Sequence, residues 1–220
     1  MNTIEIAAAL EALSCTDLSD AMDRLGIAGQ VPGIMPLERQ FNLVGRAWTL
    51  RYGPVGEDPG TVGDYIDDIG PGQVVVLDNQ GRGDATVWGD LLTTMAHRRE
   101  IAGTVIDGVC RDVDRALEVG YPIFSRGNWM RTGKDRVRVE GINVPVSLGG
   151  VRVEPGDWLR GDGDGLVVIP QARIDEVVEA ARAIADTEQR IRDAIAEGIT
   201  LREARAQFGY HTLQTRTSVP

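Results

Sequence analysis

The feature that most constrains this chain is an alternation of short apolar runs with stretches of helical periodicity. The apolar runs lie at 43–53, 73–81, 103–108 and 121–127, and helix-like segments separate them at 61–69, 89–101 and 112–119. Continuous apolar runs are typical of strands buried on both faces, and their alternation with helices is typical of a layered α/β domain. From Asp135 the pattern changes to strands joined by turns that contain glycine and proline.

Helices are predicted at both ends of this region. Residues 3–26 predict two short helices, with Thr16 as an N-cap, and a long helix is predicted over 171–197, followed by a shorter one that begins at Thr200. Because no repeat, low-complexity tract or linker interrupts the chain, we expect residues 1–220 to form a single domain.

Composition excludes several classes of function. The net charge is −10 and the basic residues form no stripe, which argues against nucleic acid as a partner. No run approaches the roughly 20 apolar residues that span a bilayer, and the first residues carry acids rather than a basic leader, so we expect a soluble, unprocessed protein without a membrane partner. Cys15 and Cys110 fit no zinc or disulfide spacing, which favours a cytoplasmic location, and both are expected to be small buried side chains.

An Arg-Asp pair, Arg111 and Asp112, follows the apolar run at 103–108, where the chain turns into a helix. In open α/β sheets, ligand sites gather at the carboxyl ends of the strands. The pair is therefore a candidate site. The alternative is that Asp112 is an ordinary N-cap and Arg111 its surface partner.

A second candidate is the turn "GDLL", residues 89–92. Gly89 and Asp90 precede a helical pattern, so the N–H groups near Leu91 and Leu92 would point outward from a helix N-terminus and could hold a carboxylate or a phosphate. Asp90 could equally be an N-cap with no ligand.

A third candidate is Glu188, which interrupts an apolar stripe on the long C-terminal helix. The stripe consists of Ile174, Val177, Ala181, Ile184, Ile191 and Ile195. A carboxylate on an apolar helix face is costly unless it is paired, so Glu188 indicates a helix end that leaves the core, a subunit contact, or a site.

Other polar motifs predict no chemistry. The loop "GDGDG", 161–165, begins like a calcium loop, but the twelfth position counted from Asp162 is Arg173 rather than the required glutamate. We interpret it as a turn between strands. His97 and His211 lie near no cysteine and no second histidine, so a histidine-based metal site or a Ser-His-Asp triad is poorly supplied.

The ordered motifs "GDLL", "DGVCRDVD", "NVPVSLGGVRVEPGDW" and "GDGDGLVVIP" resemble the RraA-like family over roughly residues 10–205. That family includes class II pyruvate aldolases, which act on 4-hydroxy-4-methyl-2-oxoglutarate and 4-carboxy-4-hydroxy-2-oxoadipate, and RraA proteins, which inhibit RNase E. The resemblance implies an αβ/βα sandwich of the swivelling-domain type. It also implies a homotrimer or homohexamer, with the C-terminal helices 171–208 at the subunit interface and the active site between subunits.

The resemblance also implies roles for the candidate residues. Arg111 matches the arginine that holds the pyruvyl oxygens, and Asp112 matches the carboxylate that anchors Mg²⁺ or Mn²⁺, mostly through waters. The 89–92 turn matches the backbone amides that receive the substrate carboxylate. Glu188 falls near an acid that an adjacent subunit supplies, and Asp90 or Glu188 would position or activate the water that exchanges protons.

These roles predict a divalent-metal-dependent, class II carbon-carbon lyase with a small 2-oxo acid as substrate. Aldol cleavage, or decarboxylation of oxaloacetate, leaves a pyruvate enolate, and a cation and an arginine beside the developing oxyanion stabilise its charge. An oxygen-rich site without thiolates suits a hard cation such as Mg²⁺.

One position departs from the aldolases of the family, which carry R-D-x-x-D/E. Arg115 stands where they have the second acid, and Asp114, one position earlier, points about 100° away on a helix. A decarboxylase needs only the half of the site that stabilises the enolate. Alternatively, Arg115 binds the anionic tail of another substrate, or the chain is a non-catalytic RraA-type regulator of RNase E that works through protein binding.

Overall fold

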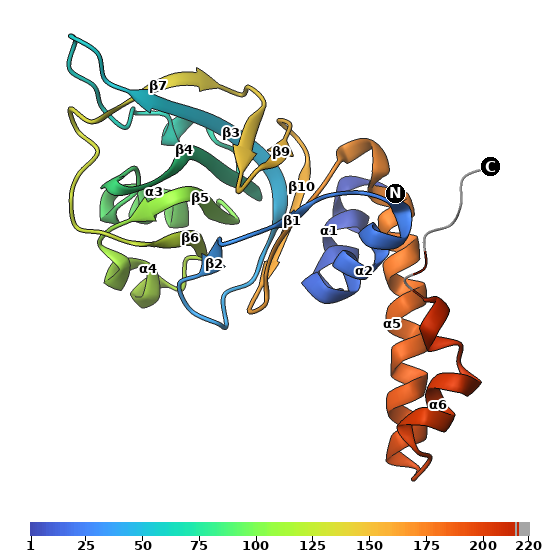
Figure 1. The fold of residues 1–220 in the computed structure, drawn as a ribbon. Helices are drawn as coiled ribbons and strands as arrows, with labels where there is room; N and C mark the ends of the chain where they lie inside the picture. The colour runs from blue at the N-terminus through green and yellow to red at the C-terminus, as the bar shows by residue number, and fades with distance from the viewer. Residues whose placement is uncertain (214, 216–220) are drawn as a thin grey trace. The chain divides into compact units, whose positions relative to one another are not determined.

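The computed structural model describes residues 1–213 and 215, which form two compact units (Figure 1). One unit comprises residues 30–171 and holds the strands, and the other joins residues 1–29 to the chain from residue 172 onward. Both units lie within residues 1–220, and the expectation that these residues form a single domain stays a prediction. Among the described residues, none of the helices combines the length and the apolar character needed to cross a membrane.

A mixed sheet forms the centre of the strand unit. Its strands are β1 (Gln30–Val31), β2 (Met35–Pro36), β3 (Leu43–Pro54), β4 (Gln73–Thr86), β5 (Gly103–Cys110), β6 (Ile123–Asn128), β7 (Val137–Ile142), β10 (Trp158–Asp162) and β11 (Gly165–Ile169). The order is β1-β11-β10-β3-β4-β5-β6-β2, with β7 on β3. Strands β3 to β6 pair in parallel, and the flanking strands pair antiparallel.

Successive residues of the parallel strands enter different cores. In β4, Val75 and Leu77 join a cluster that includes Ala96 of α3 (Asp90–Arg98) and Ala116 of α4 (Val113–Val119). Val74 and Val76 join a second cluster on the opposite face, together with residues of the hairpin β8 (Val146–Leu148) and β9 (Val151–Val153). The parallel strands are therefore covered on both faces, which explains their continuous apolar sequence. The strand unit is an α/β fold, as predicted.

Two buried acids on the sheet attach this hairpin. Asp78 Oδ2 accepts a hydrogen bond from the Ser147 N–H at 3.1 Å, and Asp107 Oδ2 accepts one from the Gly149 N–H at 2.8 Å. Asp107 also pairs with Arg126. A buried carboxylate is tolerated only when it is paired and hydrogen-bonded, so these acids have a structural role.

The helical unit contains α1 (Thr3–Glu11), α2 (Cys15–Leu25), α5 (Ile174–Ala196), α6 (Leu201–Gln207) and the short η3 (Tyr210–Thr212). The turn η2 (Gln171–Arg173) precedes α5. Capping boxes at Asn2, Ser14 and Thr200 start α1, α2 and α6. The prediction of Thr16 as an N-cap was wrong, because Ser14 accepts from the Asp17 N–H and α2 begins earlier.

The predicted strands and most predicted helices are confirmed within a few residues. The exception is the helix predicted over 61–69, where the structure has only the short turn η1 (Ile66–Asp68). Gly63 has φ +86°, which no residue of an α-helix adopts, and the Tyr52 hydroxyl donates to the Val62 carbonyl at 2.8 Å. This bond to β3 holds the segment as a loop.

Candidate active site

Two loops meet at the carboxyl edge of the parallel strands. One connects β4 to α3 and contains Trp88 and Gly89, and the other connects β5 to α4 and contains Arg111 and Asp112. The Arg111 N–H donates to the Trp88 carbonyl at 3.0 Å, which joins the loops through their backbones. The Arg-Asp pair and the "GDLL" turn, separate candidates in the sequence, therefore form one site.

Asp112 has an unusual backbone. Its φ is 54° and its ψ is 41°, the left-handed conformation, which costs an L-residue about 1–2 kcal/mol. Its side chain does not cap its own helix. Instead, Asp112 Oδ2 accepts from the Asp90 N–H of α3 at 3.4 Å and lies 3.4 Å from Arg111 Nε. The alternative of an ordinary N-cap is therefore wrong, and the strained backbone turns the carboxylate toward the neighbouring loop.

Gly89 makes room for this arrangement. A Cβ added to Gly89 would lie 2.8 Å from Asp112 Oδ2 and 3.4 Å from Arg111 Nε. The φ of Gly89 is −156°, which any residue can adopt, so the constraint is space rather than backbone freedom.

The N-terminus of α3 is open to a ligand. Its N-cap is Gly89, which has no side chain to accept a hydrogen bond, and Asp90 is the first helical residue rather than the N-cap considered above. Across the described chain, no acceptor is bonded to the N–H groups of Leu91 and Leu92. Uncapped N–H groups at the positive end of a helix dipole favour an anion.

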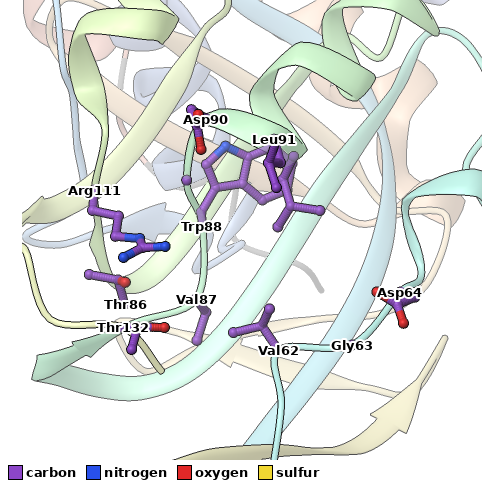
Figure 2. Close-up of a pocket in the computed structure, with 12 residues that line it drawn as sticks. Val62, Gly63, Asp64, Thr86, Val87, Trp88, Asp90, Leu91, Arg111 and Thr132 are labelled. Carbon is purple, nitrogen blue, oxygen red and sulfur yellow. The ribbon is translucent and has the colours of Figure 1, made fainter. Parts of the chain in front are cut away.

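A cavity of about 220 Å³ opens over these groups. Its lining consists of Val62, Gly63, Asp64, Thr86, Val87, Trp88, Gly89, Asp90, Leu91, Leu92, Arg111 and Thr132. Figure 2 shows Arg111 beside Thr86 and Thr132 at one side of this cavity and Asp64 at the other. The volume suits a small molecule, because pockets for larger ligands are about 300–1,000 Å³.

A second cavity of about 210 Å³ shares Arg111. It is also lined by Asp112, Val113, Asn128, Trp129 and Met130. The Trp129 N–H donates to the Cys110 carbonyl at 2.8 Å, which brings the end of β6 to the end of β5. Arg111 therefore lies at the boundary of two cavities, with Asp112 on the side of the second.

Cys110, directly before Arg111, is buried. Burial raises the pKa of its thiol above the usual value, and a hydrogen-bonding contact with Ser125 only partly opposes this. The thiol is therefore protonated at neutral pH and unsuited as a nucleophile. Cys15 is buried too, as the sequence predicted for both cysteines.

The residues of the site fit a hard divalent cation that is held by one carboxylate, waters and substrate oxygens. They do not fit a metal that is held by several protein side chains. Within residues 1–213 and 215, no group of three or more His, Cys, Asp or Glu side chains could hold a metal ion. Asp112 is the one carboxylate among the described residues that line the second cavity, 41% of its side chain is exposed, and its Oδ2 lies 2.8 Å from where a Cβ at position 89 would stand. Mg²⁺ keeps several waters and binds through one or two carboxylates plus substrate oxygens, which matches such a site.

Arg115 lies outside both cavities. Its Nε donates to Thr94 Oγ1 at 3.2 Å and its Nη1 donates to Glu118 Oε2 at 2.8 Å, so it joins α4 to α3. These contacts argue against the alternative that Arg115 binds the anionic tail of a substrate. Arg115 supports the packing of the two helices whose first turns form the site.

Glu188 belongs to the helical unit, whereas both cavities are lined by the strand unit. Its carboxylate faces Arg192 at 3.4 Å, and 27% of its side chain is exposed. Ile195 is 41% exposed, so the predicted apolar stripe does not continue to that residue. Glu188 thus lies on α5 between the buried residues Ile184 and Ile191, and its role toward a neighbouring subunit stays a prediction.

Several lining residues were missed from the sequence. Val62 and Asp64 lie in the segment predicted as a helix, and Thr86 and Thr132 come together through a bridge between residues far apart in the chain. The available signal was "VGD", 62–64, because a glycine followed by an acid marks a loop. A second signal was the apolar pair Trp129 and Met130 shortly after the predicted strand at 121–127. In the structure these two residues are 43% and 71% exposed.

Comparisons with known proteins identify the family of this chain. The family model RraA-like, described as Aldolase/RraA, matches residues 15–168. Protein DlpA of Legionella pneumophila is 43% identical over 88% of the chain, although the chain spans only 32% of DlpA. A Halalkalibacterium halodurans protein named "Putative 4-hydroxy-4-methyl-2-oxoglutarate aldolase" is 34% identical, over 89% of this chain and 91% of that protein.

Solved structures give the same result. A Pseudomonas syringae protein superposes with a TM-score of 0.86 at 43% identity, over 92% of this chain and 98% of that one. Streptomyces coelicolor RraAS2, described as an unusual member of the RNase ES inhibitor RraA protein family, superposes with a TM-score of 0.79 at 30% identity, over 86% and 96% of the two chains. The motifs, the fold and these matches together show that the chain belongs to the RraA-like family.

Proposed function

We propose that this protein is a divalent-metal-dependent lyase that cleaves or decarboxylates a 2-oxo acid through a pyruvate enolate. The observation that carries the proposal is that Arg111 and Asp112 meet the N-terminus of α3. Arg111 and this N-terminus line one small cavity, and Asp112 lines the adjoining cavity that shares Arg111. Such a site offers N–H donors for a carboxylate, a guanidinium for an oxyanion and a carboxylate for a hard cation.

Each group has a task in this proposal. The N–H groups of Leu91 and Leu92 hold the substrate carboxylate, and the guanidinium of Arg111 donates to the 2-oxo group as negative charge develops there. Asp90, which lines the cavity, positions the water that takes up or delivers a proton. Glu188 of a second copy of the chain is the further acid that a trimer or hexamer would supply.

Asp112 would hold the cation, Mg²⁺ or Mn²⁺. When bound, the cation polarises the 2-oxo group and stabilises the enolate charge. The Arg111 guanidinium, 3.4 Å from Asp112 Oδ2, keeps that carboxylate beside the substrate oxygens. Trp88, buried beneath the cavity, donates through Nε1 to Thr93 Oγ1 at 2.9 Å and so fixes the first turn of α3.

The proposal predicts metal-dependent release of pyruvate from oxaloacetate. Lactate dehydrogenase and NADH would report pyruvate, with Mg²⁺ in one series and EDTA in the other. A no-enzyme control with the same metal is needed, because oxaloacetate decarboxylates spontaneously. We expect turnover with Mg²⁺ and its loss, by about a hundredfold or more, with EDTA. Equal rates in EDTA would contradict the metal dependence.

A second candidate function is regulation by protein binding, of the RNase E type. It is favoured by the likeness to RraAS2 and by the exposed Leu91, Trp129 and Met130 around the cavities. Exposed apolar side chains of this kind occur at protein interfaces. A regulator would need no Mg²⁺ and would not release pyruvate, so the same assay separates the two functions.

A further inference from the structure

We infer that the substrate carries a single carboxylate, on its pyruvyl half, and that its distal carbon bears small uncharged groups. The inference rests on the proposed function and names the substrate class of that site, namely 4-hydroxy-2-oxo acids with an aliphatic end. It differs from the hydroxy-diacids after which several relatives are named.

The supply of positive charge carries the inference. Among the described residues that line the two cavities, Arg111 is the only cationic side chain. Arg111 and the N-terminus of α3 together suit one carboxylate and its adjacent oxo group. A second carboxylate on the same substrate would find no further cation among these lining residues.

The end of the first cavity away from Arg111 is apolar and then acidic. Val62 and Val87 lie between Arg111 and Asp64 in Figure 2, and Leu91 and Leu92 complete the lining. The lining holds two acids, Asp64 and Asp90, against one base. A carboxylate at this end would lose water to apolar side chains and approach Asp64, and both effects disfavour it.

The second cavity leads to the same conclusion. Beyond Arg111 and Asp112, it is lined by Val113, Asn128, Trp129 and Met130, none of which carries a charge. A substrate that extended from Arg111 in this direction would also place its far end among neutral groups. The inference therefore holds for either direction of extension.

Two arginines outside the cavity linings, Arg115 and Arg82, are held by other groups. Arg115 bonds to Thr94 and Glu118, and Arg82 bonds to Asp84 and the Arg136 carbonyl. Arg115, which stands where the family's aldolases have their second acid, therefore does not supply a cation for a second substrate carboxylate.

The reaction on this class needs no further reactant. The C3–C4 bond of the 4-hydroxy-2-oxo acid breaks, the 4-hydroxyl proton passes to the water at Asp90, and C4 becomes the carbonyl of a neutral aldehyde or ketone. The bonding electron pair remains on C3 as the pyruvate enolate, which takes a proton from water and leaves as pyruvate. The neutral product leaves through an apolar lining.

Two substrates that differ in one group test the inference. In 4-hydroxy-4-methyl-2-oxopentanoate C4 carries two methyl groups, and in 4-hydroxy-4-methyl-2-oxoglutarate one of them is replaced by a carboxylate. We expect kcat/KM for the monoacid to exceed that for the diacid by about tenfold or more with Mg²⁺. Lactate dehydrogenase would report pyruvate, counted as one molecule per cleavage of the monoacid and two per cleavage of the diacid.

Substitution of Asp64 tests the charge argument within the same protein. Asp64→Asn should raise kcat/KM for the diacid about threefold to tenfold and leave that for the monoacid within about twofold. Asp58→Asn removes the same charge from the same loop at an exposed residue outside the cavity lining, and it should change neither value. If Asp64→Asn left the ratio of kcat/KM for the monoacid to kcat/KM for the diacid unchanged, the charge argument for the first cavity would be overturned.

The outcomes separate this inference from the proposed function. Preference for the monoacid supports it. Equal or better cleavage of the diacid overturns it and leaves the lyase intact, as does failure to cleave either compound by an enzyme that still exchanges the methyl protons of pyruvate. Loss of that exchange as well would defeat the proposed function itself.

Discussion

Replacement of Asp112 by asparagine is expected to lower metal-dependent pyruvate release by about a hundredfold to a thousandfold. The change removes the charge that would hold the cation and leaves the size of the side chain unchanged. Stability should change by no more than about 0.5 kcal/mol, because asparagine tolerates the left-handed backbone as well as aspartate does. Turnover with Mg²⁺ and thermal unfolding would be measured on the same preparation.

Two further variants of Asp112 separate charge from backbone strain. Asp112→Gly and Asp112→Ala both remove the carboxylate, so both should be inactive. The glycine variant should be about 1 kcal/mol more stable than the alanine variant, since φ +54° penalises a Cβ. Retention of more than a tenth of the turnover in any of the three variants would refute the assignment of Asp112.

Arg111→Lys is expected to lower kcat/KM by about a hundredfold or more. Lysine keeps the charge but offers a single ammonium in place of the planar fork, which can donate to two oxygens of a 2-oxo acid at once. Arg111 is 41% exposed and its side chain makes only a 3.4 Å pair with Asp112, so folding should be little affected. Steady-state kinetics at saturating Mg²⁺ would give the value.

Arg115→Lys is the matched control. It makes the same substitution four residues later, at a side chain that contacts Thr94 and Glu118 rather than either cavity. Activity should stay within about threefold of the unchanged protein. If Arg115→Lys lost as much activity as Arg111→Lys, the conclusion that Arg115 lies outside the substrate's reach would be wrong.

Much of the fold could be predicted because the strands carry a strong local signal. The 103–108 run is buried at every residue in β5, and such runs have few alternatives to a central parallel strand. The prediction of a helix over 61–69 was wrong although the apolar residues have helical spacing. Gly63 and the hydrogen bond from Tyr52 of β3 to the Val62 carbonyl hold this segment as a loop. Tertiary contacts of this kind have no local signature.

The candidate site, like the fold, could be predicted only in part. Arg111, Asp112 and the 89–92 turn could be found because each stands at the end of an apolar run, where α/β sheets hold ligands. Their contact through the Asp90 N–H and the left-handed backbone of Asp112 could not, because both depend on the pairing of β4 with β5 and on space at Gly89. Asp64 enters the cavity only through the fold.

The exchange of pyruvate methyl protons with solvent tests the central claim, a site that stabilises the pyruvate enolate, without knowledge of the full substrate. Pyruvate would be incubated in D₂O with the protein and Mg²⁺, and the methyl signal would be followed by proton NMR beside samples with EDTA and without protein. We predict loss of the signal only when protein and Mg²⁺ are both present, and much slower loss with Asp112→Asn. A methyl signal that decays no faster than in the protein-free sample would contradict the account.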